Sequence, residues 1–246
     1  VKMPAGPILS ITPFNFPLNL ALHKIGPALA CGCPIVWKPA PQTPLSALYF
    51  AKLYLEAGLP ENGLQVVITQ NEQSEWLVKS NHFSILSFTG SDKVGWYLKS
   101  IANKKKVFLE LGGNAALVID ETAHLQKAAE RAVMGSFLYA GQICISTQRI
   151  LVHAKVYEEF KNLLIKETLK IKTGNPVDEK VICGPVISKK DLERIKLWVN
   201  EAVEKGANII CGGKIIDEKH HLYAPTILEN TPKNINIYNQ EAFAPI

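Results

Sequence analysis

The sequence predicts an α/β fold in which a doubly wound, Rossmann-like domain is followed by a second α/β domain. Three observations carry this prediction. The chain has 246 residues, of which 47% are hydrophobic and 20% charged, a composition typical of a folded protein with a substantial core. Short apolar runs bounded by proline or glycine alternate with longer stretches of helical periodicity. This alternation occurs twice along the chain, as expected for sheets covered by helices.

The first half of the chain shows the clearest alternation. Compact apolar runs predict five strands, at residues 8–12, 34–37, 65–69, 85–88 and 106–111. Helical periodicity predicts helices over residues 18–30 and 44–57. Pro44 stands at the start of the second helix and Gly58 follows its end, which is the expected asymmetry. The fourth strand runs into a Gly-Ser turn that opens a further helix, so residues 1–111 form the expected doubly wound domain.

A second set of elements is expected after the glycine pair at 112–113. Its strands are predicted at residues 115–119, 150–152 and 209–210, and its helices over residues 122–139, 155–168 and 191–205. Asp120 is the expected N-cap of the first of these helices, because its carboxylate can accept from the unpaired N–H groups of the first turn. We therefore expect a second domain over residues 112–246.

Charge and hydropathy argue against nucleic-acid and membrane partners. Lys and Arg number 27 and Asp and Glu 22, a net charge of +5, but the basic residues are scattered apart from the run at 104–106. The most apolar stretch, residues 18–37, is interrupted by His23, Lys24 and two prolines, so it is not expected to span a membrane. The first residues hold no charged leader followed by an apolar core, so no signal peptide is expected.

The cysteines indicate a reducing environment. There are five, an odd number at dispersed positions, which argues against a disulfide framework and for a cytoplasmic setting. Cys31 and Cys33 form a C-x-C pair without a second pair of ligands at zinc spacing. We therefore expect small buried residues there and no metal site.

Two glycine-containing segments follow expected strands. Thr89, Gly90 and Ser91 lead into a helix, whose unpaired first-turn N–H groups and dipole favour a phosphate, although an ordinary capped helix start would also use these residues. Glu110 stands just before the glycines at 112–113, which allow a ligand to approach the backbone closely. A surface glutamate before a turn is the alternative interpretation of Glu110.

Two further residues are candidates for chemistry. Cys144 follows a long helix and Gly141, so it is a candidate nucleophile, although a buried apolar cysteine is the alternative. Asn15 is held between Pro13 and Pro17, where a rigid amide donor can stabilise an oxyanion, and a structural turn is the alternative.

Taken in order, these motifs resemble those of the aldehyde dehydrogenase superfamily. The matching segments are P-F-N-F-P at 13–17, W-K-P-A at 37–40, F-T-G-S at 88–91, L-E-L-G-G at 109–113, G-Q-I-C at 141–144 and Q-E-A-F-A-P at 240–245. The spacings from Glu110 to Cys144 and from Cys144 to Glu241 also resemble those of the family. The resemblance covers nearly the whole chain and implies an NAD(P)-binding domain at 1–111 and a catalytic thiol domain at 112–246.

The resemblance implies a role for each matched residue. Cys144 matches the catalytic thiol, Glu110 the general base, and Asn15 the donor that stabilises the oxyanion. These roles imply the oxidation of an aldehyde to a carboxylic acid through a cysteine thiohemiacetal and a thioester. The implied cofactor-binding residues are Ile11, Thr12, Pro13, Phe14, Lys38, Pro41, Gly63, Thr89, Gly90, Ser91, Leu111, Gly112, Glu241 and Phe243.

The implied cofactor is NAD or NADP. Lys38 matches the lysine that binds the adenosine ribose, and Glu241 and Phe243 match the pair that positions the nicotinamide ribose and ring. Members that prefer NAD usually carry a glutamate three residues after the lysine, where this chain has Pro41. Because no carboxylate at that position repels a 2′-phosphate, Pro41 favours the use of NADP.

Three functional hypotheses follow from the resemblance and the length of the chain. Members of the family are longer, so we expect this chain to be the central segment, with the first part of the cofactor domain and the last part of the catalytic domain outside it. The leading hypothesis is an NAD(P)-dependent aldehyde dehydrogenase, and Glu110 argues against the acylating type that uses coenzyme A. The others are an inactive truncated fragment with a structural or binding role, and a cofactor-independent thiol esterase using Cys144 and Asn15. The expected partners are a small-molecule aldehyde and, at full length, further copies of the chain.

Overall fold

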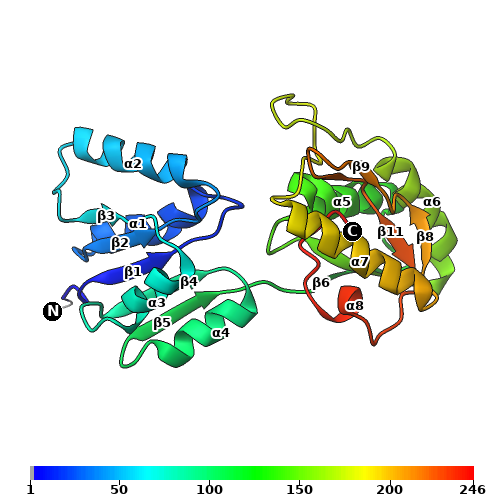
Figure 1. Ribbon diagram of the computed structural model, residues 1–246. Helices are drawn as coiled ribbons and strands as arrows, with labels where there is room; N and C mark the ends of the chain where they lie inside the picture. Colours follow the sequence, from blue (N-terminus) through cyan, green and yellow to red (C-terminus); the bar gives the residue numbers. More distant parts are fainter. Residues whose placement is uncertain (1–2) are drawn as a thin grey trace. The chain divides into compact units, whose positions relative to one another are not determined.

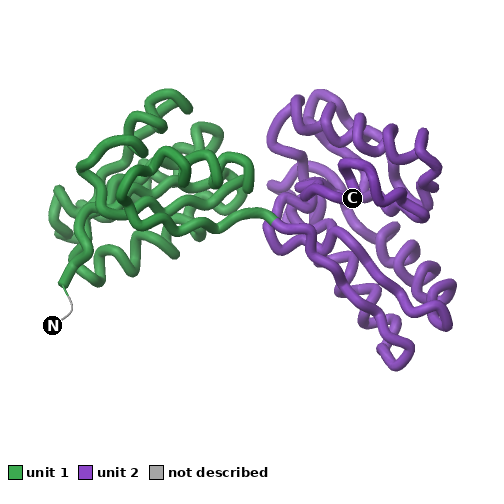
Figure 2. The backbone as a smooth tube through the Cα atoms, turned by 90° about the horizontal axis from the view of Figure 1, so that it is seen from below, with its two compact units in different colours: residues 1–112 green, residues 113–246 purple. Residues whose placement is uncertain are grey.

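The computed structural model describes residues 3–246, and the chain divides into two compact units, residues 1–112 and 113–246 (Figure 2). Unit 1 has buried clusters centred on Trp37 and on Leu86, and unit 2 has others centred on Tyr223 and on Phe160. Each unit therefore has its own hydrophobic core, and each is described separately below.

Unit 1 is built on a five-stranded parallel sheet with the order β3-β2-β1-β4-β5 (Figure 1). The strands are β1 (Ile8–Ile11), β2 (Ile35–Lys38), β3 (Leu64–Val66), β4 (Ile85–Thr89) and β5 (Lys106–Glu110). The chain moves outward through β1, β2 and β3 and then returns to β4 on the other side of β1, so the strand order reverses between β1 and β4. This arrangement confirms the doubly wound, Rossmann-like prediction.

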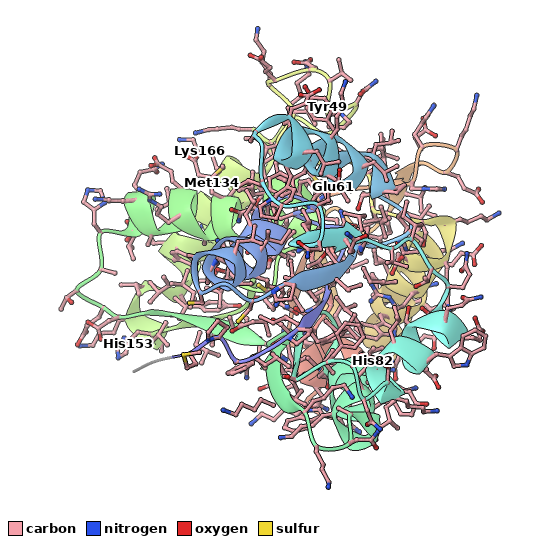
Figure 3. The ribbon with its side chains drawn as sticks, turned by 90° about the vertical axis from the view of Figure 1, so that its left-hand side faces the viewer. Tyr49, Glu61, His82, Met134, His153 and Lys166 are labelled. Carbon is pink, nitrogen blue, oxygen red and sulfur yellow. The ribbon has the colours of Figure 1, made fainter. Side chains whose placement is uncertain are left out.

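Helices cover both faces of this sheet, because its strands are apolar on both sides. The helices are α1 (Asn19–Ala30), α2 (Pro44–Glu56), α3 (Asn71–Lys79) and α4 (Asp92–Ile101). Side chains of α1 and α2 form one cluster with Ile35 and Trp37, whereas those of α3 and α4 form another with Leu9 and Leu86. The outer side of α2 is exposed, and Tyr49 on it points away from the sheet (Figure 3).

Unit 2 contains three small sheets in place of one large one. In these, β6 (Ala115–Ile119) pairs with β7 (Thr147–Val152), β8 (Asn208–Cys211) with β11 (Ile227–Glu229), and β9 (Ile215–Asp217) with β10 (Leu222–Tyr223). The helices are α5 (Leu125–Phe137), α6 (Tyr157–Thr168), α7 (Lys189–Glu204) and α8 (Asn236–Asn239), with short 3-10 segments η1 (Leu138–Gly141) and η2 (Ala154–Val156). Apolar faces of α5 and α6 pack together around Phe160, beside β6 and β7.

The first helix of unit 2 begins later than the sequence predicts. The Oδ1 atom of Asp120 accepts from both the N–H and the hydroxyl of Thr122, at 3.0 and 2.8 Å, which closes a local turn. The N-cap is His124, whose ring nitrogen accepts from the N–H of Lys127 at 3.4 Å. The prediction of Asp120 as N-cap was therefore wrong, because its carboxylate bonds to Thr122 before the helix begins.

Other boundaries differ by a few residues. The third strand is limited to Leu64–Val66, and α3, which the sequence did not predict, follows it after a short loop. Across residues 3–246, every helix is too short or too polar to cross a membrane.

Candidate active site

In unit 1, most of the predicted site residues lie at one edge of the sheet. All five strands are parallel, so their carboxyl ends meet at the same edge. Thr12 to Asn15 follow β1, Pro41 follows β2, Gly90 and Ser91 follow β4, and Leu111 and Gly112 follow β5. The strand order reverses between β1 and β4, and in open α/β sheets ligands bind outside the carboxyl ends at this point.

Glu110 lies beside the Gly-Ser turn. In the β4–β5 register Thr89 is opposite Glu110, and the N–H of Gly90 donates to the backbone oxygen of Glu110 at 3.0 Å. The side chain of Glu110 is exposed. The structure therefore brings the predicted base and the predicted phosphate-binding turn together on adjacent strand ends.

The helix after this turn packs closely against the end of β5. A Cβ on Gly95 of α4 would lie 2.4 Å from Cδ2 of Leu111, so a larger residue there would have to displace the Leu111 side chain. In the first turn of α4, the carboxylate of Asp92 accepts from the N–H of Lys93 at 2.7 Å. An anion at this helix start would therefore use the N–H groups not engaged by Asp92.

The loop after β1 is fixed to the end of β2. The N–H of Thr12 donates to the backbone oxygen of Lys38 at 3.2 Å, and the Thr12 hydroxyl accepts from Nε1 of Trp37 at 2.8 Å. Asn15, three residues further on, is buried with 4% of its surface exposed. Thr12 thus has a structural role in holding the segment that carries Asn15.

Lys38 and Pro41 have contrasting environments. Lys38, the last residue of β2, is 6% exposed, and burial lowers the pKa of its ammonium group. Pro41 is exposed at the second position of a turn in which the N–H of Thr43 donates to the backbone oxygen of Ala40 at 3.1 Å. Proline is favoured at that position because its φ is already fixed near the required value.

Gly63 lies apart from the other predicted cofactor residues. It precedes β3 and its backbone oxygen accepts from the N–H of Ile35, the first residue of β2, so it belongs to the amino edge of the sheet. A Cβ at Gly63 would lie 2.2 Å from the hydroxyl of Tyr54. Gly63 therefore has a packing role under α2.

In unit 2, Cys144 lies in the loop between η1 and β7 and is partly buried. Three consecutive residues before this loop have positive φ: Tyr139 at 56°, Ala140 at 55° and Gly141 at 67°. Left-handed backbone costs roughly 1–2 kcal/mol for a residue with a side chain. A Cβ on Gly141 would lie 2.0 Å from the backbone oxygen of Ala244, so glycine is required there.

Two polar side chains hold this loop in place. Gln142 is 4% exposed; its Nε2 donates to the backbone oxygens of Tyr139 and Pro185, both at 3.2 Å, and its Oε1 accepts from the N–H of Ile187 at 2.9 Å. The hydroxyl of Ser146 donates to the backbone oxygen of Gly135 at 3.2 Å. Sequence reasoning assigned neither side chain a role, because their partners are distant or on the preceding helix.

The segment with Glu241 and Phe243 lies close to the Cys144 loop. The N–H of Gly113 donates to Oε1 of Glu241 at 3.4 Å, and the N–H of Ala242 donates to Oε1 of Gln148 at 2.7 Å. A Cβ on Gly113 would lie 3.9 Å from the backbone oxygen of Cys144. Within unit 2 the structure therefore gathers Gly113, Cys144 and Glu241.

The other cysteines have different surroundings. Cys183 is wholly buried, and burial raises the pKa of its thiol to about 12. Burial also raises the pKa of the Cys211 thiol. Cys33 is buried as expected, whereas Cys31 is exposed, so the expectation of a buried Cys31 was wrong; all five cysteines are free thiols. Because the thiolate is the nucleophile, raised pKa values make Cys183 and Cys211 poor candidates for nucleophilic chemistry.

Unit 1 is a doubly wound α/β sheet with polar residues at its carboxyl edge, and unit 2 holds a partly buried cysteine thiol. The model of the aldehyde dehydrogenase family matches residues 1–246. The chain belongs to the aldehyde dehydrogenase family.

Individual relatives place the chain within the family. It is 47% identical over 246 residues to a 3-sulfolactaldehyde dehydrogenase of Priestia aryabhattai, covering all of this chain and 51% of that protein. An NADP-dependent enzyme of E. coli superposes with a TM-score of 0.95 at 39% identity, over 99% of this chain and 51% of the other. Betaine aldehyde dehydrogenase of Staphylococcus aureus, solved with NAD+, gives a TM-score of 0.94 at 33% identity, over 98% and 49%. The chain thus spans about half the length of the relatives it matches.

Proposed function

We propose that the full-length protein oxidises an aldehyde to a carboxylic acid with NAD or NADP as cofactor, and that Cys144 is its nucleophile. The observation that carries the proposal is the setting of Cys144. Its thiol is partly buried in a loop that Gln142 and Ser146 hold, whereas burial disfavours the thiolate of Cys183 and Cys211. Membership of the family and the similar solved enzymes support the same assignment.

The first chemical step in this proposal belongs to Cys144. Its thiolate adds to the aldehyde carbon, and the carbonyl oxygen becomes the alkoxide of a thiohemiacetal. Asn15 is proposed to donate its amide N–H to that oxygen, because its side chain is buried in a loop fixed by Thr12. Loss of hydride from the thiohemiacetal carbon then leaves a thioester on Cys144.

The residues at the carboxyl edge of unit 1 fit a dinucleotide. We propose that Lys38 pairs with an adenosine ribose or its phosphate, and that the start of α4 at Gly90 and Ser91 binds the pyrophosphate. When bound, the cofactor supplies the hydride acceptor that the protein's own side chains cannot provide. We therefore propose that unit 1 binds the cofactor, that unit 2 carries the thiol, and that Glu241 and Phe243 position the nicotinamide.

The last step in this proposal belongs to Glu110. Its carboxylate accepts a proton from water while the water oxygen attacks the thioester carbon, which releases the carboxylic acid and restores the thiol. Its exposed position at the end of β5 leaves it accessible to water. This role distinguishes hydrolysis from transfer of the acyl group to another thiol.

We also propose that the full-length protein is a cytoplasmic homo-oligomer. The five free cysteines suit a reducing compartment, and the exposed apolar side chains of α2, among them Leu45 and Tyr49, suit burial against protein. Light scattering of the purified full-length protein measures the oligomeric state, and a monomer would contradict this part of the proposal.

The test of the function is absorbance of NADH or NADPH on adding aldehydes to the full-length protein. The wild-type enzyme and a Cys31→Ala variant should reduce the cofactor, because Cys31 is an exposed cysteine of unit 1. Cys144→Ala should reduce none above background, since the covalent step is lost. Normal turnover by Cys144→Ala would contradict the assignment, and ester cleavage without cofactor reduction by the wild type would contradict the function.

A further inference from the structure

Ala242 lies between the two residues proposed to position the nicotinamide, and both of its backbone polar groups are bound by side chains of other elements. Its N–H donates to Oε1 of Gln148 at 2.7 Å, and its backbone oxygen accepts from Nη1 of Arg194 at 2.8 Å. Ala242 is 3% exposed, and backbone groups in such a setting need partners within the protein. Two side chains therefore fix the short segment that carries Glu241 and Phe243.

Gln148, the second residue of β7, uses both ends of its amide. While its Oε1 accepts from Ala242, its Nε2 donates to the backbone oxygen of Gly113 at 3.0 Å. An amide can accept and donate at the same time, which an ionised carboxylate cannot do. The N–H of Gly113 in turn donates to Oε1 of Glu241 at 3.4 Å. Gln148 therefore joins β7, the first residue of unit 2 and the segment of Glu241.

Arg194 of α7 is itself held on two sides. Its Nη2 is 3.4 Å from Oδ1 of Asp191, and its guanidinium lies over the ring of Trp198, 4.9 Å from the ring centroid. The same carboxylate accepts from the hydroxyl of Ser188 at 2.6 Å. A planar guanidinium can pair with a carboxylate, stack on a ring and donate to a third group at once. Arg194 is therefore already oriented to donate to Ala242.

The backbone just after Ala242 is strained. Phe243 has a φ of 46°, in the left-handed region that costs energy for a residue with a side chain. Such conformations persist where the surrounding structure determines them, and they cluster at ligand sites. The backbone oxygen of Ala244 lies against Gly141, where a Cβ would approach it to 2.0 Å. The held segment therefore also contacts the loop that leads to Cys144.

We propose that Gln148 and Arg194 are positioning residues that hold the backbone of Ala242. By fixing this residue they set how the neighbouring Glu241 and Phe243 face the nicotinamide end of the cofactor. This inference rests on the proposed function, which assigns those two neighbours to the nicotinamide. Neither positioning side chain touches the aldehyde in this scheme. Their loss should therefore impair hydride transfer and not the intrinsic reactivity of the thiol.

The first experiment measures the restraint itself and needs no turnover. In the full-length protein without cofactor, hydrogen–deuterium exchange of the peptide that contains residues 238–246 should quicken in Arg194→Met and in Gln148→Met. We expect a change of roughly 2- to 10-fold in each, the effect of losing one hydrogen bond. Arg131→Met is the matched control, since Arg131 is an exposed arginine of α5. Unchanged exchange in either variant would overturn the inference.

The second experiment separates positioning of the cofactor from a general structural role in the full-length enzyme. Arg194→Met should slow the initial burst of NAD(P)H roughly 10- to 100-fold, the effect of a misplaced reacting group. Cleavage of 4-nitrophenyl acetate without cofactor should stay within about twofold of the wild-type rate, because the ester reacts with the thiol alone. Arg194→Lys should give an intermediate burst, because its ammonium can donate to the same oxygen but lacks the planar fork that also reaches Asp191.

The outcomes of this second experiment are distinct. Equal loss of the burst and of ester cleavage would show a structural role and overturn the inference, as would an Arg194→Lys enzyme no faster than Arg194→Met. A wild type that cleaves the ester but does not oxidise aldehydes would instead overturn the proposed function. Hydrogen exchange would then still decide whether the two side chains hold residue 242.

Discussion

In unit 1 the residues proposed for cofactor binding and base catalysis follow directly from the ends of a hydrogen-bonded sheet, whereas in unit 2 the proposed nucleophile lies in a loop held by side chains. The five parallel strands of unit 1 fix Glu110 and Gly90 through their own backbone ladder. The Cys144 loop depends on Gln142, Ser146 and three left-handed residues. A backbone ladder holds a strand end in place whichever side chains it carries. We therefore expect a side-chain substitution to disturb the Cys144 loop more than the strand ends of unit 1.

The two units also differ in the size of their sheets and in the polarity of their interiors. Unit 2 has three two-stranded sheets, and a cavity of about 260 Å³ lies among residues of β7, α6 and β11. Its walls combine apolar side chains with the polar group of Tyr157, Lys161 and Glu229, in which the Lys161 ammonium is 3.0 Å from the Glu229 carboxylate. Burial and hydrogen bonding to Glu229 raise the pKa of Tyr157 to about 12. Unit 2 therefore combines small sheets with a group of polar side chains beside its cavity.

The largest expected effect in this comparison concerns Glu110 of unit 1. Glu110→Gln in the full-length enzyme keeps the strand end intact but cannot accept a proton from water. Steady turnover should fall roughly 10²- to 10⁴-fold, the usual contribution of a general base, while the pre-steady-state burst of NAD(P)H survives. Stopped-flow absorbance measures both quantities, and an equal fall in burst and turnover would show that Glu110 acts before the thioester forms.

A smaller effect is expected for Gln142 of unit 2, and it tests the dependence of the loop on side chains. Gln142→Ala removes the side-chain acceptor of the partly buried N–H of Ile187, and the loss of one hydrogen bond costs roughly 0.5–1.5 kcal/mol. Urea unfolding should show this loss, and iodoacetamide should alkylate Cys144 faster because the loop is less constrained.

The matched variant for that prediction is Gln126→Ala. Gln126 lies on α5, and its Nε2 donates to the carboxylates of Glu130 at 2.7 Å and Glu167 at 2.9 Å, away from the Cys144 loop. Its removal should leave the alkylation rate of Cys144 unchanged. If both variants behave alike, the loop does not depend on Gln142, and the contrast between the two units fails.

The smallest expected effect concerns cofactor choice at the edge of unit 1. Pro41→Glu should lower the NADP-to-NAD ratio of kcat/KM, since a carboxylate near a 2′-phosphate is repelled. Pro41 is exposed in a turn, so the substitution should leave stability nearly unchanged. Steady-state kinetics with both cofactors measure the ratio, and an unmoved ratio would assign the preference to other residues.

Sequence reasoning was most successful in unit 1. Each predicted strand there corresponds to an observed one, because each is an apolar run bounded by proline, glycine or polar residues. It missed α3, which is polar and begins after Gln70 instead of a usual capping residue. The strands β9, β10 and β11 have two or three residues each and irregular registers, so periodicity had too few positions to detect them.

The site was predicted as a set of motifs and not as a set of contacts. Cys144, Glu110 and Asn15 stand in recognisable segments. Their roles as candidate nucleophile, base and oxyanion donor could therefore be predicted from the sequence alone. The support of Gln142 by residues 185–187 is tertiary, and no local pattern encodes it. Gly63 shows a motif residue without the expected neighbours. It was predicted to bind the cofactor, but it lies under Tyr54 at the amino edge of the sheet.

The most direct test of Cys144 as the nucleophile is the mass of the enzyme after one turnover. Full-length Glu110→Gln enzyme, mixed with an aldehyde and NAD(P) and quenched in acid, should gain the mass of one acyl group. Peptide mapping should place that group on Cys144, because the thioester forms but hydrolysis is slow. An acyl group on Cys31, Cys183 or Cys211, or cofactor reduction without any acyl-enzyme, would contradict the assignment.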